Sequence, residues 1–224
     1  GNFAMADGKQ GGIQSIFKLS SRPQCDIVQK HDQTIDLEPE GLSTHVYVAE
    51  CTNCQLVLKQ KAGKVLIEKC QDLVLTMSAE LVSGTLEVVK SSKICIKINS
   101  KLKIPTITAD STTGLQVILL EKEEQVESLY FHESSDLTIT VQGEGVEKKE
   151  YVANPPADSA AHRQFIAHWV KNEDGVQLKT ENVVREGVFP NAEGELKEAL
   201  QRDKQNAEKA FSTLEKEYMS AKKK

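Results

Sequence analysis

The 224-residue sequence has no long apolar run, no excess of basic residues and no visible secretory signal. Its longest apolar run, LQVILL, is far shorter than the roughly 18 to 20 residues of a membrane-spanning helix. Lys and Arg number 28 against 33 Asp and Glu, a formal net charge of −5, whereas phosphate binding favours a basic face. We therefore expect no membrane insertion and no nucleic-acid partner.

Cysteine is also scarce, with five residues in the chain. An odd number in a chain of this length is not typical of a disulfide framework, and a reducing cytoplasm is the expected compartment. Cys51 and Cys54 form a Cys-x-x-Cys pair, which is half of many structural zinc sites. The surrounding segment AECTNCQLVL is followed by a similar one, EKCQDLVLTM, which raises the alternative of a repeating structure.

A repeat of about 20 residues runs through most of the chain. We align small or polar residues in one column: Asp32, Cys51, Cys70, Ser91, Thr112 and Ser134. The positions five before, three after and five after this column are all apolar. They are Ile27, Val46, Val65, Leu86, Ile107 and Leu129; Ile35, Cys54, Leu73, Ile94, Leu115 and Leu137; and Leu37, Leu56, Leu75, Ile96, Val117 and Ile139.

Apolar positions two residues apart predict strands with alternate side chains facing inward. Helical repeats would show a 3.6-residue period, and leucine-rich repeats would show an Asn ladder; neither pattern occurs here. The remaining architecture is an all-β fold, a parallel β-helix of about six coils stacked ~4.8 Å apart. Small side chains would then lie at a corner, where Ser, Thr and Asp can bond turn amides. Cys51, Cys54 and Cys70 become core thiols, and no metal site is expected because a lone Cys-x-x-Cys lacks its second pair.

The chain changes character after the coils. The segment from Gly143 to Ala161 is polar with a Pro-Pro pair, and we interpret it as a linker. Residues 164–187 predict a β-hairpin whose turn lies between Asn172 and Gly175. Its apolar residues are Phe165, Trp169, Val176, Leu178, Val183 and Val184.

The last segment predicts a helix with apolar residues along one side, interrupted by Lys204. These apolar residues are Leu200, Ala207, Phe211, Leu214 and Tyr218. We therefore divide the chain into an N-terminal arm (1–26) that opens with GNFAM, an expected cloning remnant, a β-helix domain with its hairpin (27–187) and a helical tail (188–224).

Three segments in order resemble the C-terminal domain of adenylyl cyclase-associated protein. They are VAECTNCQLVLKQKAGKVLIEKCQDLVL, TLEVVKSSKICIKINSKLKIPTITADSTTG and QFIAHWVKNEDGVQLKTENVVREG. The chain has only six prolines and no proline-rich tract, so it is similar to short, single-domain protist forms of the family. Gln71, Asp72 and Ser111 stand where the family commonly has Lys.

The resemblance implies a right-handed parallel β-helix that dimerises by exchanging its C-terminal hairpin. It also implies binding of monomeric actin and promotion of nucleotide exchange on it, without a cofactor. We expect the basic group of the central coils to contact actin, although these lysines could equally serve only to solvate a sheet face and block its edges. The group consists of Lys59, Lys61, Lys64 and Lys69.

Two other functional classes stay open. The histidines share no catalytic spacing, and no phosphate-binding glycine loop occurs, so we expect no catalytic residues. A tubulin-cofactor-C-like regulator of GTPases would need an Arg on a coil, but all four arginines lie outside the central coils. A non-catalytic scaffold that binds other chains through the flat β-helix face is the third interpretation.

Overall fold

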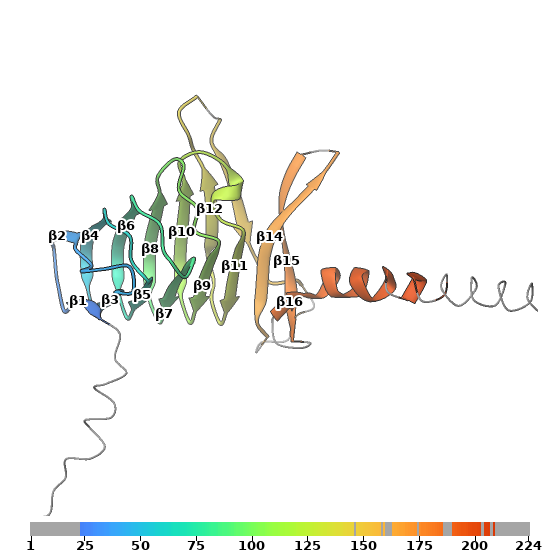
Figure 1. Ribbon diagram of the computed structural model, residues 1–224, viewed down its shortest axis with the longest axis horizontal. Coiled ribbons are helices and arrows are strands. Elements are labelled where there is room, and N and C mark those ends of the chain that lie inside the picture. The colour runs from blue at the N-terminus through green and yellow to red at the C-terminus, as the bar shows by residue number, and fades with distance from the viewer. Residues whose placement is uncertain are drawn as a thin grey trace, which may run out of the picture.

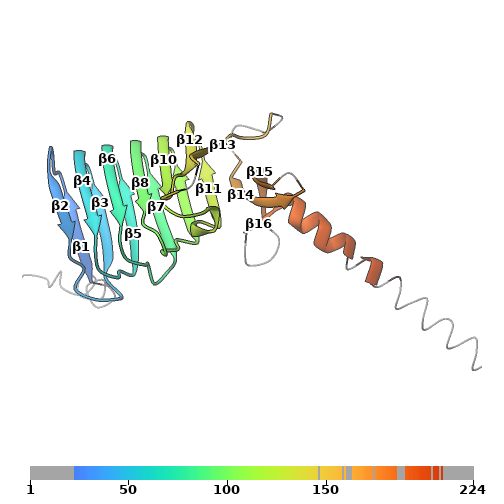
Figure 2. The same cartoon turned by 90° about the horizontal axis from the view of Figure 1, so that it is seen from above.

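The computed structural model of the chain describes residues 23–145, 147–157, 159, 163–173, 175–185, 190–202, 204–206 and 208. Its strands wind into a solenoid of two facing sheets, with a hairpin and a helix at the C-terminal end (Figure 1). Seen from above, the coils follow one another along a single axis (Figure 2). The predicted fold, a right-handed parallel β-helix of about six coils, is confirmed.

Each coil contributes one strand to each sheet. The nine-stranded sheet runs in the order β1 (Gln24–Val28), β3 (His45–Ala49), β5 (Lys64–Glu68), β7 (Thr85–Val89), β9 (Thr106–Asp110), β11 (Ser128–His132), β14 (Phe165–Asn172), β15 (Gly175–Arg185) and β16 (Pro190–Ala192). The seven-stranded sheet runs in the order β13 (Lys149–Ala153), β12 (Leu137–Val141), β10 (Thr113–Leu119), β8 (Ser92–Ile98), β6 (Gln71–Met77), β4 (Thr52–Leu58) and β2 (Thr34–Leu37). A short 3-10 helix, Glu123–Gln125, lies between β10 and β11.

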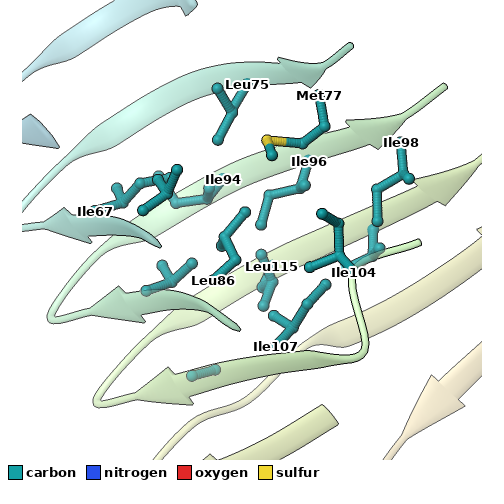
Figure 3. Packing of buried hydrophobic residues seen from close by; sticks show 14 of the residues in the cluster. Ile67, Leu75, Met77, Leu86, Ile94, Ile96, Ile98, Ile104, Ile107 and Leu115 are labelled. Atoms are coloured by element: carbon teal, nitrogen blue, oxygen red, sulfur yellow. The ribbon is translucent and has the colours of Figure 1, made fainter. Parts of the chain in front are cut away.

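The alternation of apolar residues forms the core. Leu73, Ile94 and Leu115 pair in register on β6, β8 and β10, and each is at most 1% exposed. The side chains of Ile94 and Leu115 meet those of the opposite sheet, including Leu86 and Ile107 (Figure 3). Full burial of such a side chain stabilises the fold by roughly 1.5–3 kcal/mol, so these stacked rows supply much of the driving force for folding.

The corner column is confirmed from the second coil onward. The backbone N–H groups of Cys51, Cys70, Ser91 and Thr112 each donate to the side chain of the next residue in the column, at 3.4, 3.0, 3.4 and 3.0 Å. Ser134 ends this series as the acceptor for Thr112. Each side chain also donates to the carbonyl two residues before it, as Ser91 Oγ does to Val89 at 2.8 Å. We call this series the corner ladder.

The thiols of Cys51, Cys54 and Cys70 all lie inside the solenoid, at most 2% exposed. Cys54 pairs with Leu73, so it occupies a row of core side chains, as predicted. Its Sγ donates to the carbonyls of Lys30 and Thr52, both at 3.4 Å. Burial is the main cause that raises the pKa of Cys70, to about 12, which keeps that thiol protonated at neutral pH.

The predicted register of the first coil is wrong by two residues. Ile27 pairs with Val48 rather than aligning with Val46, and Ile35 pairs with Leu56 rather than aligning with Cys54. Asp32 therefore does not belong to the column of Cys51. A shift of two residues preserves which side chains face inward, so the apolar pattern could not reveal the error.

Asp32 belongs instead to a column of residues with a left-handed backbone. Its φ is 53°, close to 53° at Asn53, 51° at Asp72, 52° at Lys93 and 54° at Asp136, and Gly114 in the same column has 73°. Asn, Asp and Gly tolerate this conformation better than other residues. The column therefore sets the bend that leads into each strand of the seven-stranded sheet.

The C-terminal end of the solenoid is covered by antiparallel strands. The segment that we interpreted as a linker contains β13, which pairs with β12, so that interpretation is wrong for Lys149–Ala153. The predicted hairpin is confirmed: β14 pairs with β15 up to Asn172 and Gly175, and β14 also pairs with β11. Because β11 and β12 form the last coil, β13 and β14 occupy the edges that it would otherwise leave open.

The chain continues from β16 into a helix that is described over residues 193–202 and projects from the end of the solenoid (Figure 1). Leu200, from the predicted apolar stripe, is 52% exposed. The other four stripe residues, Ala207, Phe211, Leu214 and Tyr218, lie outside the described residues, as does most of the predicted N-terminal arm.

The corner ladder predicts the effect of replacing Thr112 with Val. The substitution keeps the shape of the side chain but removes the acceptor for Ser91 N–H and the donor to the Asp110 carbonyl. We expect the free energy of unfolding in urea to fall by about 1–3 kcal/mol, since a buried amide loses its partner. Thr108→Val, on the outer face of β9, is the control and should change stability by less than about 0.5 kcal/mol. Equal effects of the two substitutions would contradict a stabilising role for the ladder.

Candidate functional site

Three of the four predicted actin-contact lysines lie at one corner of the solenoid. Lys59 follows β4, Lys61 lies in the connection to β5, and Lys64 is the first residue of β5. Lys69 follows the last residue of β5. Five residues of extended chain separate Lys64 from Lys69 by about 16 Å, so Lys69 lies at the opposite corner.

Each lysine of the first corner forms an ion pair with a carboxylate from a neighbouring coil. Lys59 pairs with Asp36 at 2.6 Å, Lys61 with Glu80 at 2.7 Å, and Lys64 with Glu87 at 3.0 Å. The Lys59 and Lys61 side chains are 61% and 57% exposed, and such pairs contribute little to stability. The corner is therefore a mixed-charge surface rather than a basic one.

An apolar groove opens beside this corner. It has a volume of about 370 Å³ and is lined by Leu42, Ser43, His45, Gly63, Lys64, Val82 and Ser83. Leu42 and Val82 are 61% and 64% exposed, although both are large apolar side chains. Exposed apolar side chains that gather beside charged ones often mark a protein contact.

Gly63 allows two neighbouring coils to approach closely beside the groove. A Cβ at this position would lie 3.0 Å from His45 Cδ2 and 3.1 Å from the carbonyl oxygen of Ser43. The groove joins the β2–β3, β4–β5 and β6–β7 connections of three successive coils. Sequence reasoning missed it, because its residues are about 20 positions apart in loops that have no apolar periodicity.

The hairpin is fastened to the solenoid through its aromatic residues. Trp169 Nε1 donates to the carbonyl of Val126 at 2.7 Å, and its ring meets Tyr151 edge-on at 4.9 Å between centroids. Phe165, 5% exposed, packs on Phe131 at 5.3 Å. These two predicted hairpin residues therefore contact the solenoid of the same chain.

The rest of the predicted hairpin set is only half-buried. Leu178 packs partly against the core, and Val176, Val183 and Val184 are each intermediate in exposure. A single chain thus leaves much of the apolar surface of β15 incompletely covered.

A second groove, of about 440 Å³, lies where the solenoid, the hairpin and the helix meet. Its lining consists of Lys103, Glu124, Glu127, Ser128, Tyr130, Ile166, His168, Trp169 and Glu195. The charges around it are largely paired, as in Lys103–Glu127 at 2.5 Å and Lys171–Glu124 at 3.0 Å. The hydrogen bond from Lys171 is the largest cause that lowers the pKa of Glu124.

Glu181 connects the hairpin to the helix. Its carboxylate lies 2.7 Å from His168 Nε2 and 3.2 Å from Lys179 Nζ, and it accepts the backbone N–H of Gly194 at 3.1 Å. Burial raises the pKa of Glu181, but hydrogen bonds from His168 and Lys179 lower it by more, so the net pKa lies below its ordinary value of 4.5. The first turn of the helix is thus held by a charged acceptor.

The described residues contain no group of three or more His, Cys, Asp or Glu side chains that could hold a metal ion. In the same part of the chain, no helix is long and apolar enough to cross a membrane.

The Glu181 contacts predict a pH effect on the helix. A carboxylate with a lowered pKa stabilises the fold at pH above 4.5, and this contribution is lost as the pH falls below that value. We expect amide exchange in residues 193–202, corrected for intrinsic rates, to become about tenfold less protected on acidification through this window. Glu181→Gln should remove part of the pH dependence and Glu198→Gln should preserve all of it; the remainder comes from Glu193 in the same helix, whose pKa is also lowered, mainly by a hydrogen bond from Lys197. An unchanged acid response in Glu181→Gln would assign the effect to another group.

Comparison with known proteins places this architecture in a family. The chain is 24% identical to adenylyl cyclase-associated protein 1 from Bos taurus over 123 residues, which are 55% of this chain and 25% of that protein. The Homo sapiens protein of the same name is also 24% identical over the same shares of each chain. This chain therefore aligns with only about a quarter of the length of these relatives.

Among solved structures, cyclase-associated protein from Cryptosporidium parvum matches with a TM-score of 0.49 and 19% identity, covering 70% of this chain and 86% of that one. The family model described as "Adenylate cyclase associated (CAP) C terminal" matches residues 24–183, from the first strand of the solenoid into the second strand of the hairpin. The chain therefore belongs to the adenylate cyclase associated (CAP) C-terminal family.

Proposed function

We propose that this protein binds monomeric actin in the cytoplasm and promotes nucleotide exchange on it, without catalysing a reaction itself. The observation that carries the proposal is the family match over residues 24–183, which spans all six coils and most of the hairpin. The order of the three sequence segments that resemble the family supports the same conclusion.

The contact surface that we favour is the corner formed by Lys59, Lys61 and Lys64 together with the groove between Leu42 and Val82. Exposed apolar side chains provide area that can be desolvated, and the surrounding charges orient the partner. Lys69, at the other end of β5, would contact the same actin molecule only if the interface extended across the face of the nine-stranded sheet.

The mechanism follows from differential affinity. A protein that binds actin with a loosened nucleotide site more tightly than the closed form shifts the population toward the loosened form. The shift equals the difference between the two binding free energies, and no catalytic group is needed. Coils joined by continuous backbone pairing suit this role, because a surface of fixed shape would match one actin conformation better than another.

The other functional classes have less support. An arginine supplied to a GTPase from a coil, as in a tubulin-cofactor-C-like regulator, has no candidate because residues 24–141 contain no Arg. A scaffold that binds other proteins through the flat sheet faces would use the same exposed residues as the actin proposal, so only a binding experiment separates these two functions.

We also propose that two chains form a homodimer through their hairpins. The half-buried Val176, Val183 and Val184 would be covered by a second copy related by twofold symmetry. The pairing of β14 with β11 could be made within one chain or between two, since the connection over residues 154–164 is long enough for either. The family resemblance favours exchange.

Charge reversal tests the actin surface. We expect the purified protein to bind monomeric actin and accelerate release of a fluorescent nucleotide, and Lys61→Glu with Lys64→Glu to weaken binding by about tenfold or more. Because Glu80 and Glu87 would then face new carboxylates, thermal unfolding is measured in parallel. Lys148→Glu with Lys149→Glu makes the same change in net charge near the C-terminal end of the solenoid and should bind normally.

The two parts of the actin proposal fail separately. If the unaltered protein does not bind actin when both are present at roughly tens of micromolar, where even weak protein complexes form, the proposed function is refuted. Normal binding by the double variant would refute only the contact surface.

Light scattering and a designed disulfide test the dimer. We expect a mass of about twice 24.8 kDa for the full chain, and a chain without residues 190–224 should still have twice its own, smaller, monomer mass. Ser128 and His168 pair directly across β11 and β14, so Ser128→Cys with His168→Cys places two thiols within bonding reach. Hairpin exchange predicts a covalent dimer on a non-reducing gel, and Ser128→Cys alone is the control. A covalently closed monomer would show that each hairpin covers its own solenoid.

A further inference from the structure

The second groove, where the solenoid, the hairpin and the helix meet, combines aromatic walls with a negatively charged rim. Tyr130 and Trp169 line it, and both side chains are only half-buried, so parts of their rings stay accessible. The lining also holds three carboxylates and one ammonium group, those of Glu124, Glu127, Glu195 and Lys103. This composition favours a cationic ligand over an anion or a purely apolar molecule.

Each carboxylate comes from a different part of the chain. Glu124 belongs to the 3-10 helix, Glu127 to the connection that leads into β11, and Glu195 to the C-terminal helix. All three residues are exposed, and the first two pair closely with lysines. The ion pair of Glu195 is long, at 3.9 Å to His168 Nδ1, and His168 is already bonded to Glu181 through Nε2 at 2.7 Å. Glu195 is therefore the carboxylate that is most available to an incoming cation.

The aromatic walls lie near this carboxylate and are held in place. Burial is the main cause that raises the pKa of Tyr130, and the charge of Glu195 raises it further, so the two side chains lie near each other. Trp169 is fixed by its hydrogen bond to the Val126 carbonyl and by its edge-on contact with Tyr151. Rings that are already fixed can bind a cation with little further loss of side-chain entropy.

A guanidinium group matches these features better than the other cations of proteins. It is planar and delocalised, so it can stack on an aromatic ring while its N–H groups bond carboxylates in its own plane. A lysine ammonium has no flat face, and a hard metal ion would gain nothing from the rings. The exposed rim also lets the peptide chain on either side of an arginine remain outside the groove.

We propose that the second groove binds an arginine side chain of a partner protein, with the guanidinium stacked against Trp169 and Tyr130 and hydrogen-bonded to Glu195. The groove has the same composition whether β14 comes from the same chain or from a second one, because either arrangement pairs β14 with β11. A bound arginine would connect the solenoid, the hairpin and the helix, since each contributes to the lining. The inference is independent of actin binding.

Trp169 is the only tryptophan of the chain, so its fluorescence reports directly on the groove. We expect a capped Gly-Arg-Gly peptide, added to the full chain at low salt, to change this emission with a dissociation constant of about 1 mM. The same peptide with citrulline keeps the planar group but not its charge, and should bind about tenfold more weakly. Gly-Lys-Gly should bind about threefold more weakly. No saturation by the arginine peptide at roughly 10 mM, or equal binding of either analogue, would overturn the proposal.

Variants of the lining locate the contact. Glu195→Gln should weaken binding of the arginine peptide about fivefold, whereas Glu198→Gln removes the same charge from the same helix outside this groove and should bind normally. Tyr130→Leu leaves the helix unaltered and should also weaken binding severalfold, with Tyr47→Leu on the distant β3 as its control. Circular dichroism confirms that each variant is folded. If Glu195→Gln or Tyr130→Leu bound as tightly as its control, the groove would not be the site and the proposal would be overturned.

Discussion

The structure depends on in-register stacking of successive coils. Each strand pairs residue for residue with its equivalent one coil away, and the corner ladder repeats that register outside the strands. No coil can slip without breaking both sets of bonds and misaligning the core rows, such as Leu73, Ile94 and Leu115. A side chain on the outer surface therefore meets its neighbour at a fixed spacing, ~4.8 Å per coil, and Lys59, Lys61 and Lys64 each reach a carboxylate on an adjacent coil.

Stacking has a second consequence, because a solenoid has two ends that its own repeat cannot close. At the C-terminal end the chain reverses direction, and β13 and β14 pair antiparallel with the last coil. Trp169 fixes that arrangement by bonding the Val126 carbonyl and packing on Tyr151. The sequence stops repeating where the solenoid ends. The hairpin and the helix are therefore free of the repeat pattern, and the hairpin also covers the end of the stack.

The inward rows from the second coil onward could be predicted from sequence, because only one assignment of faces buries them. The first coil could not be placed from the same pattern, since a two-residue shift keeps Ile27 and Ile35 facing inward. The register of the first coil is marked instead by the column of Asp32, Asn53 and Gly114. These residue types recur because the backbone there is left-handed, not because the side chains are apolar. The sequence did not predict β13, because its residues are largely polar or exposed. It did not predict the groove between Leu42 and Val82 either, because the lining residues come from three separate loops.

The pairing of the predicted lysines changes how a partner could be recognised at that corner. A lone lysine attracts an acidic surface at long range, whereas Lys61 beside Glu80 presents a dipole whose field falls off more steeply. An acidic partner would have to share or displace Glu80 and Glu87, which costs part of the electrostatic gain. Most of the affinity at this corner would then come from desolvation of Leu42 and Val82, with the ion pairs setting orientation. Binding there should accordingly depend less on salt than binding to a basic patch would, and more on the apolar groove that Leu42 and Val82 line.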